Sequence, residues 1–185
     1  MSIVEKTSET ILSRTYRQLH DNPLTNIGCT VALVNENIYH WKCSLIGPND
    51  SIYKKGLFRL FIKFPKDFPF SGPEVIFDTP IYHLNVNPKK GKEPLGHICL
   101  STINFWTPDS SIEDLLVSIF ALFYAANSDS PYGIKMKEEF EKNRELYNYK
   151  AQFFTKKYAV PKKTSDRLDK WDFSINDDEI KIKNK

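Results

Sequence analysis

The stretch YHWKCSLIGPNDSIYKKGLFRLFIKF, residues 39–64, decides the fold class of this chain. It holds two runs of strand length, 39–46 and 57–64, that are rich in apolar, aromatic and β-branched side chains. Between the two runs lies GPND at 47–50, whose residue types favour turns. The stretch therefore predicts two antiparallel neighbours in one sheet.

Two shorter runs flank this pair of strands. CTVALV at 29–34 comes before it, across the turn residues NEN, and EVIFD at 74–78 comes after it, across the proline-rich segment FPKDFPFSGP. The spacing of the runs predicts a four-stranded antiparallel meander.

Segments outside the strands show helical periodicity. One spans 9–20, a second begins at Ser110, where Ser110 and Glu113 fit a capping box, and the last spans 135–158. Residues 79–110, between the strands and the later helices, are irregular and rich in proline. The order of helix, strands, loop and helices predicts an α+β domain with the helices on one side of the sheet.

Length, composition and charge limit the classes of function. The chain has 185 residues, of which 41% are hydrophobic and 14% aromatic, and this suits one globular domain, which we place at 1–160. Apolar residues become sparse from Pro161, so we expect 161–185 to be a flexible C-terminal extension. The formal net charge is only +3 and the basic residues are scattered, so charge indicates neither a nucleic-acid nor a membrane partner.

Targeting signals and cysteine usage indicate a compartment. The N-terminal MSIVEKTSET lacks the apolar core of a signal peptide, and no apolar run approaches the roughly 20 residues of a membrane span. Cys29, Cys43 and Cys99 have no short spacing between them, which favours reduced thiols. We therefore expect a cytoplasmic and/or nuclear protein.

Cys99 is the candidate for chemistry, in the stretch GHICLSTINFWTP at 96–108. A cysteine between apolar residues is often a small buried hydrophobe, which is what we expect of Cys29 and Cys43. Cys99, however, lies in a long irregular loop, and such loops often carry function. His83 and His97 are candidate bases for it, whereas the absence of a CxxC pair and of a clear fourth ligand argues against zinc.

Several motifs around Cys99 resemble those of the ubiquitin-conjugating enzymes, over about residues 9–159. They are WKCSLIGPNDSIYKKGLF, FPKDFPFSGPEVIF, YHLN at 82–85, GHICLS, WTP at 106–108, NSDSP and the closing TKKYA. Their order and spacing agree with the family. The resemblance implies the fold of that family, with a long active-site loop and no metal or organic cofactor.

The resemblance also implies a chemistry. Cys99 would accept ubiquitin, or a ubiquitin-like modifier, as a thioester from an activating enzyme that consumes ATP, and pass it to a substrate lysine or a ligase. Asn85 would either stabilise the oxyanion of the transfer step or support the loop. Ser130 would gate the incoming lysine or only form a turn before Pro131. The cleft-supporting residues would be Tyr82, His83 and Asn127.

Partner surfaces follow from the same resemblance. Ligases of the RING/U-box or HECT type, together with the activating enzyme, would contact Arg14, Phe70, Trp106, Thr107 and Pro108. The carried ubiquitin would lie on Val117 and Ala121. The resemblance implies a monomer. Two alternatives stay open: a catalytically weak variant that binds ubiquitin or a partner, and a conjugating enzyme for a different modifier.

The chain departs from the family pattern in three places. Leu84 replaces the proline of the family's histidine–proline–asparagine triplet, which leaves the backbone less restricted. The segment 86–98 is longer than usual and contains Lys89, Lys90 and Lys92. The first helix has Glu9-Thr10-Ile11 where basic residues are common, which leaves Arg14 and Arg17 for the activating enzyme.

Overall fold

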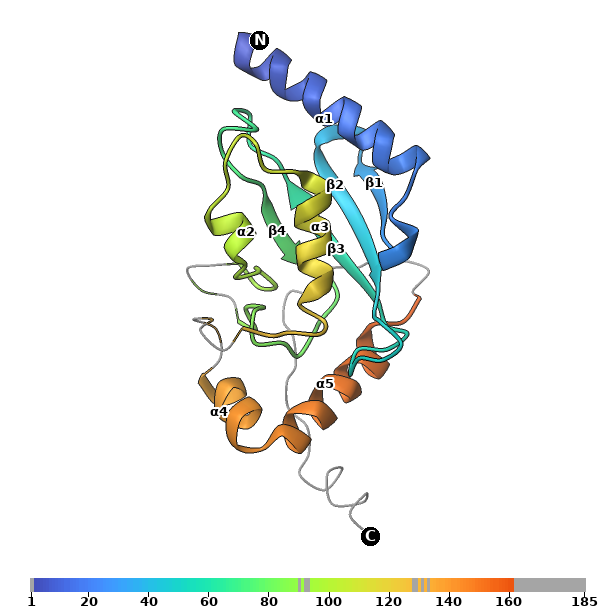
Figure 1. Cartoon of the computed structure of the whole chain (residues 1–185), viewed down its shortest axis with the longest axis vertical. Helices are drawn as coiled ribbons and strands as arrows, with labels where there is room; N and C mark the ends of the chain where they lie inside the picture. Colours follow the sequence, from blue (N-terminus) through green and yellow to red (C-terminus); the bar gives the residue numbers. More distant parts are fainter. Residues whose placement is uncertain are drawn as a thin grey trace.

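The computed structural model describes residues 2–89, 91, 94–127, 130, 132 and 134–161, with the side chain of Lys135 left out. At its centre lies a four-stranded sheet in the order β1-β2-β3-β4, with every neighbouring pair antiparallel (Figure 1). The strands are β1 (Thr30–Val34), β2 (Asn37–Ile46), β3 (Leu57–Lys63) and β4 (Glu74–Phe77). The predicted meander is therefore confirmed.

The turn between β1 and β2 is tighter than the sequence suggested. Val34 pairs with Asn37, which leaves Asn35 and Glu36 as a two-residue loop, and both have positive φ angles of 51° and 58°. This is the backbone conformation that two-residue hairpins prefer. The strand β2 consequently begins two residues earlier than the predicted start at Tyr39.

One face of the sheet carries the core. Alternate residues of β2, Tyr39, Trp41, Cys43 and Leu45, are buried, as period-2 side-chain alternation requires. The same cluster of buried residues includes Leu12 and Leu19 of the first helix, Ile112, Leu115, Leu116 and Ile119 of α3 (Ile112–Ala121), and Ala151 and Phe154 near the C-terminus. Figure 1 shows α3 in yellow in front of the sheet and the first helix along its upper edge.

The first helix, α1 (Ile3–Asp21), begins six residues before the predicted start. Ser2 is its N-cap: the N–H of Glu5 donates to Ser2 Oγ at 3.1 Å, and the N–H of Ser2 donates to Glu5 Oε2 at 2.9 Å. This reciprocal pair is a capping box, and the Ser-x-x-Glu pattern is present in the sequence. The helix ends at Asp21, with Asn22 as its C-cap before Pro23, close to the predicted end. A short 3₁₀ helix, Thr25–Ile27, leads into β1.

The cap of α3 is Ser111, so the prediction of Ser110 was wrong by one residue. Ser111 Oγ accepts hydrogen bonds from the N–H groups of Glu113 and Asp114, at 3.1 and 3.3 Å. Ser110 Oγ instead accepts from the N–H of Thr107 at 3.0 Å, within the preceding turn. Both consecutive serines have a side chain that can cap a helix, but only Ser111 lies at the N-cap position.

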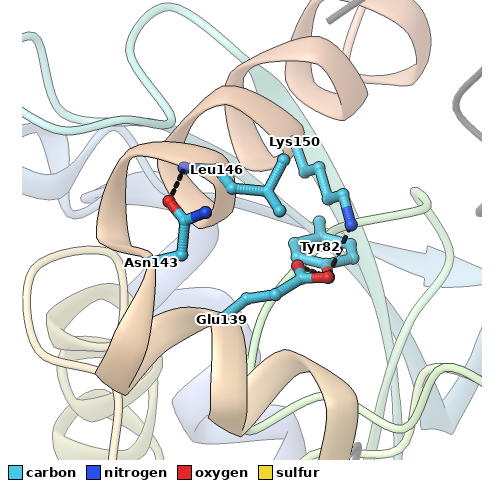
Figure 2. Close-up of polar contacts among 5 residues, drawn as sticks. All are labelled: Tyr82, Glu139, Asn143, Leu146 and Lys150. Carbon is cyan, nitrogen blue, oxygen red and sulfur yellow. Dashed lines mark hydrogen bonds and ion pairs between the residues drawn. The ribbon is translucent and has the colours of Figure 1, made fainter. Parts of the chain in front are cut away.

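The predicted helix 135–158 is two helices, α4 (Ile134–Lys142) and α5 (Arg144–Tyr158). Asn143 separates them: it has φ −144°, and its Oδ1 accepts from the N–H of Leu146 at 3.1 Å (Figure 2). Asparagine is a preferred N-cap residue. None of the helices in the described part of the chain is long and apolar enough to cross a membrane.

The predicted irregular segment 79–110 is irregular only in part. It contains the short helix α2 (Ser101–Asn104) and two isolated bridges, Ile76 with His97 and Val86 with Ile98. At the other end of the domain, the N–H of Leu57 donates to the carbonyl of Ala159 at 2.9 Å, which ties the end of α5 to β3. The predicted flexible extension, from residue 162 onward, lies outside the described residues.

Candidate active site

Cys99 lies beside residues 82–87, which we term the strap. The N–H of Cys99 donates to the carbonyl of Asn85 at 2.8 Å, and its neighbour Ile98 forms the bridge with Val86. Ile98 also donates its N–H to the carbonyl of Val75 in β4 at 3.3 Å. The backbone on the N-terminal side of Cys99 is thus fixed between the strap and the sheet.

Exposure separates Cys99 from the other cysteines. Cys29 and Cys43 are buried, as predicted, whereas Cys99 is half-buried. No sequence pattern predicts that Cys29 and Cys43 meet, yet their Sγ atoms lie 3.4 Å apart across the β1–β2 hairpin. The hydrogen bond to Cys29, together with burial, raises the pKa of Cys43, so its thiol stays protonated and is a poor nucleophile. This leaves Cys99 as the candidate nucleophile.

Asn85 joins the strap to two other segments. Its Oδ1 accepts from the N–H of Asn127 at 2.8 Å, and its Nδ2 donates to the carbonyls of Cys99 and Asn127, both at 3.4 Å. The residue is 1% exposed. The structure therefore gives Asn85 the loop-supporting contacts that were one of its two expected roles. Both donor contacts are long, and hydrogen bonds weaken beyond about 3.2 Å, so the amide nitrogen is only weakly held.

Both ring nitrogens of His83 have partners other than Cys99. Its Nε2 lies 2.8 Å from the carbonyl of Leu122, and its Nδ1 accepts from the N–H of Asn85 at 3.0 Å. Burial lowers the pKa of His83 to about 4, although the hydrogen bond to Leu122 partly opposes this shift. The ring is therefore neutral at pH 7, with Nε2 as the donor and Nδ1 as the acceptor.

His97 faces a different partner. Its Nδ1 lies 2.8 Å from the hydroxyl of Tyr132. The contact joins the segment before Cys99 to the segment after Asn127, on which Ser130 lies. The N–H of Ser130 donates to the carbonyl of Asn127 at 3.3 Å, and Ser130 Oγ accepts from the N–H of Tyr132 at 3.4 Å. These are turn contacts; because residues 128, 129, 131 and 133 lie outside the described part, the gating role of Ser130 stays a prediction.

Tyr82 begins the strap and is held at both ends. Its carbonyl accepts from the hydroxyl of Tyr53 at 2.8 Å, and its own hydroxyl donates to Glu139 Oε2 at 2.5 Å. Lys150 donates to the other carboxylate oxygen, Glu139 Oε1, at 2.6 Å (Figure 2). Sequence reasoning missed Glu139 and Lys150. The available signal was helical spacing: Glu139 follows the apolar Met136 by three positions, and Lys150 follows Tyr147 by three. This spacing places each charged residue on the same helix face as an apolar one.

The longer segment 86–98 is closed at its base. Asn87 exchanges backbone hydrogen bonds with the far side of the segment: its N–H donates to His97 at 2.8 Å and its carbonyl accepts from Gly96 at 2.9 Å. Its side-chain Nδ2 also donates to the carbonyl of Pro94 at 3.0 Å. Gly96 has φ +83°, and a Cβ there would lie 2.2 Å from the carbonyl oxygen of Phe77, so glycine is required. Lys89 is exposed, while Lys90 and Lys92 lie outside the described residues.

The predicted ligase-contact residues form one exposed region. Phe70 is 65% exposed, and Thr107 and Pro108 are exposed as well. Trp106 is half-buried and joins the two loops, because its Nε1 donates to the carbonyl of Pro69 at 2.9 Å. This hydrogen bond holds the two loops together, and the ligase contact of Trp106 stays a prediction.

The other predicted contact residues lie on outward helix faces. Arg14 is exposed on α1, where it shares a shallow surface with Lys6 and Arg17. Lys6 was not expected in this group, because the helix begins earlier than predicted. Val117 and Ala121 are exposed on α3. No group of three or more His, Cys, Asp or Glu side chains that could hold a metal ion occurs within the residues that the structure describes.

Comparison with known protein families gives one match. The family model described as ubiquitin-conjugating enzyme matches residues 12–155. The matched range contains the whole sheet, the strap, Cys99 and most of α5. It agrees with the resemblance inferred from the motifs.

Proposed function

Because the chain belongs to the ubiquitin-conjugating enzyme family, we propose that it is an active conjugating transferase. It accepts ubiquitin or a ubiquitin-like modifier as a thioester on Cys99 from an activating enzyme. It then passes the modifier to a substrate lysine or to a ligase. The observation that carries this proposal is that Cys99, alone among the cysteines, is half-exposed and fixed beside Asn85.

The chemistry requires two acyl transfers at Cys99. In the first, the thiolate of Cys99 attacks the carbonyl carbon of the modifier's C-terminal thioester; a new C–S bond forms, and the thiol of the activating enzyme leaves. In the second, a lysine amine attacks the Cys99 thioester, an amide forms, the amine loses a proton, and the thiol of Cys99 is released. The oxyanion of the second step requires a preorganised donor, and an asparagine amide can supply one.

Asn85 suits both of its expected roles in the second step. Its strong contact, from Asn127 to Oδ1, holds the side chain in place. Its amide nitrogen has only long contacts to carbonyl oxygens, so little hydrogen-bond energy is lost when it turns to an oxyanion at Cys99. We propose that Oδ1 supports the loop and that Nδ2 stabilises the oxyanion.

The partner surfaces are part of the same proposal. Phe70, Thr107 and Pro108 form an exposed apolar anchor for a ligase of the RING/U-box or HECT type. The cations of α1, Lys6, Arg14 and Arg17, contact the activating enzyme, and the outer face of α3 at Val117 and Ala121 contacts the carried modifier. We place the enzyme in the cytoplasm and/or nucleus, acting as a monomer.

A charging assay tests the proposal. The purified chain is incubated with ATP and a panel of activating-enzyme and modifier pairs, and the adduct is followed on a non-reducing gel. We expect a reducible adduct with one pair, its loss in Cys99→Ala, and a slower, thiol-resistant ester in Cys99→Ser. A reducible adduct that survives Cys99→Ala would show that another cysteine is the acceptor.

The same panel tests a second candidate, a conjugating enzyme for a modifier other than ubiquitin. The observation that favours it is the mixed charge of the α1 surface, where Glu9 and Asp21 lie among the cations. Charging only with a ubiquitin-like modifier and its own activating enzyme would select this candidate. Failure with every pair, with binding of free modifier, would select the catalytically weak variant.

A further inference from the structure

A buried ion pair stands behind the strap. The side chains of Glu139 and Lys150 are only 9% and 13% exposed, and Lys150 Nζ lies 2.6 Å from Glu139 Oε1. The second carboxylate oxygen, Oε2, accepts the hydroxyl hydrogen of Tyr82 at 2.5 Å. Each carboxylate oxygen thus has a different partner, and Figure 2 shows Glu139, Tyr82 and Lys150 gathered at this point.

The break between α4 and α5 makes this pair possible. Glu139 and Lys150 are separated by 11 positions, which would place them about 16 Å apart along one continuous helix. The cap at Asn143 ends that continuity, and the two helices turn to face each other. The local sequence thus brings two opposite charges onto Tyr82 from two elements.

Stability alone is a weak reason for such a pair. Removing two charges from water is costly, and well-packed apolar residues often give an equally stable core. The surroundings here are apolar and aromatic: the ring of Tyr82 lies against Tyr147 and Phe154, with centroids 5.5 and 5.7 Å away. Apolar side chains would fit this environment, so the charged pair suggests a role in orienting a neighbouring group.

The group that the pair orients is Tyr82. Its hydroxyl is fixed by Glu139 and its carbonyl by Tyr53, so both its side chain and its backbone are held. Asn85 follows three residues later, and its carbonyl accepts from the N–H of Cys99. Only His83 and Leu84 lie between Tyr82 and Asn85, so a displacement of Tyr82 reaches Asn85 and Cys99 through a short stretch of backbone.

We propose that Glu139, held by Lys150, is a positioning residue for the transfer reaction: through the hydroxyl of Tyr82 it fixes the strap, and with it the Asn85 side chain beside Cys99. Neither Glu139 nor Lys150 touches the reacting atoms. The proposal deepens the transferase function and rests on it for its kinetic part, but its structural part can be measured on the uncharged protein.

Hydrogen exchange measures the structural part. Tyr82→Phe removes the hydroxyl and keeps the ring, and Tyr39→Phe is the matched control, because the buried Tyr39 donates its hydroxyl to the carbonyl of Glu5 on the far side of the core. We expect peptides covering 83–87 to exchange on the order of tenfold faster in Tyr82→Phe, as the loss of a charge-assisted hydrogen bond allows. Exchange in the strap that matches wild type would overturn the proposal, whether or not the protein can be charged.

An apolar replacement separates positioning from stability. The triple variant Tyr82→Phe, Glu139→Leu, Lys150→Met leaves none of these polar groups unpaired and keeps their packing, so we expect its melting temperature to equal or exceed that of wild type. If the pair only stabilises the domain, this variant will transfer the modifier at the wild-type rate. Positioning predicts a discharge rate lowered on the order of tenfold at normal stability. A stable triple variant with wild-type discharge and wild-type strap exchange would refute the role.

A double-mutant cycle tests the route through Asn85. Single-turnover discharge to free lysine is measured for Tyr82→Phe, Asn85→Ala and the combination, each after loading. If Tyr82 acts through Asn85, the tyrosine change will slow the wild type but have little further effect in the Asn85→Ala background. Independent, multiplying effects would contradict the proposed route. A wild-type chain that never charges would remove the transferase function, and the exchange measurement would then decide the positioning alone.

Discussion

Replacing Asn85 with alanine separates loop support from oxyanion stabilisation, because its two polar atoms have different partners. The variant loses one strong hydrogen bond, from the N–H of Asn127 at 2.8 Å, and two long ones at 3.4 Å. Counting about 1 kcal/mol for the first and less for each of the others, we expect a loss of about 2 kcal/mol in the free energy of unfolding. For a domain of this size that is a fall of about 4 to 8 °C in melting temperature.

The kinetic effect of Asn85→Ala should fall on discharge. Loss of one oxyanion donor costs about 3 kcal/mol, or roughly a hundredfold in rate. Loading at Cys99 should continue, since the Cys99 thiolate is the nucleophile of that step. The assay is single-turnover discharge of the Cys99 thioester to free lysine, measured beside loading and thermal melting of the same preparation.

Asn87→Ala is the matched control for this experiment. Asn87 is a buried asparagine of the same strap, and its side chain contacts Pro94 and Lys89, so its removal also weakens a loop. We expect a comparable fall in melting temperature with discharge within a fewfold of wild type. Equal discharge rates for wild type and Asn85→Ala would refute the oxyanion role. Equal losses of discharge in Asn85→Ala and Asn87→Ala would assign both residues to loop support.

Three further predictions concern stability and the C-terminal segment. Burial lowers the pKa of His83 to about 4, against 6.5 in the unfolded state, so between these pH values only the unfolded state binds the proton. The free energy of unfolding should therefore fall by about 3 kcal/mol as the pH is lowered from 6.5 to 4. Urea unfolding at several pH values should show this loss, and His83→Gln should reduce the pH dependence. Leu84→Pro should destabilise by about 2 to 4 kcal/mol, because Leu84 is 1% exposed and its backbone hydrogen-bonds to Tyr147; an unchanged melting temperature would show that the strap accepts proline freely. Truncation after residue 161 should leave charging and melting temperature unchanged, since few apolar residues follow; a large loss of stability would show a packed tail.

The sheet could be predicted from the sequence, and the candidate nucleophile Cys99 proposed from it, because their signals are local. Period-2 alternation in 39–46 and the apolar run at 57–64 predict strands directly, and the motif around Cys99 is contiguous. Helix bounds were less accurate where two signals competed. Ser110 and Ser111 both fit a cap, and the Ser2–Glu5 capping box precedes the first apolar repeat, so the periodicity alone placed the start of α1 too late.

Contacts between distant segments could not be predicted in the same way. The pairing of Glu139 with Lys150 depends on the turn at Asn143. The helical periodicity of 135–158 predicts one continuous helix and therefore no turn there. The approach of Cys29 to Cys43 depends on the register of β1 against β2, which shifts between Leu33 and Val34 and cannot be read from the turn alone. The dual contacts of Asn85 likewise require the end of α3 to return to the strap, and no local pattern encodes that return.

Because the segment 86–98 is hydrogen-bonded across its base, its tip is a suitable site for attaching a probe. Asn87 is tied to Gly96 and His97 on the domain side, whereas a Cβ added at Gly91 would meet none of the residues that the structure describes within 4 Å. Extra length in a loop with fixed ends adds little free energy. A fluorophore, epitope or crosslinker inserted at Gly91 would therefore sit outside the tethered base while leaving the backbone of Cys99 undisturbed. For the same reason, we expect that the tip of the segment 86–98 can change in length and charge without moving the backbone of Cys99.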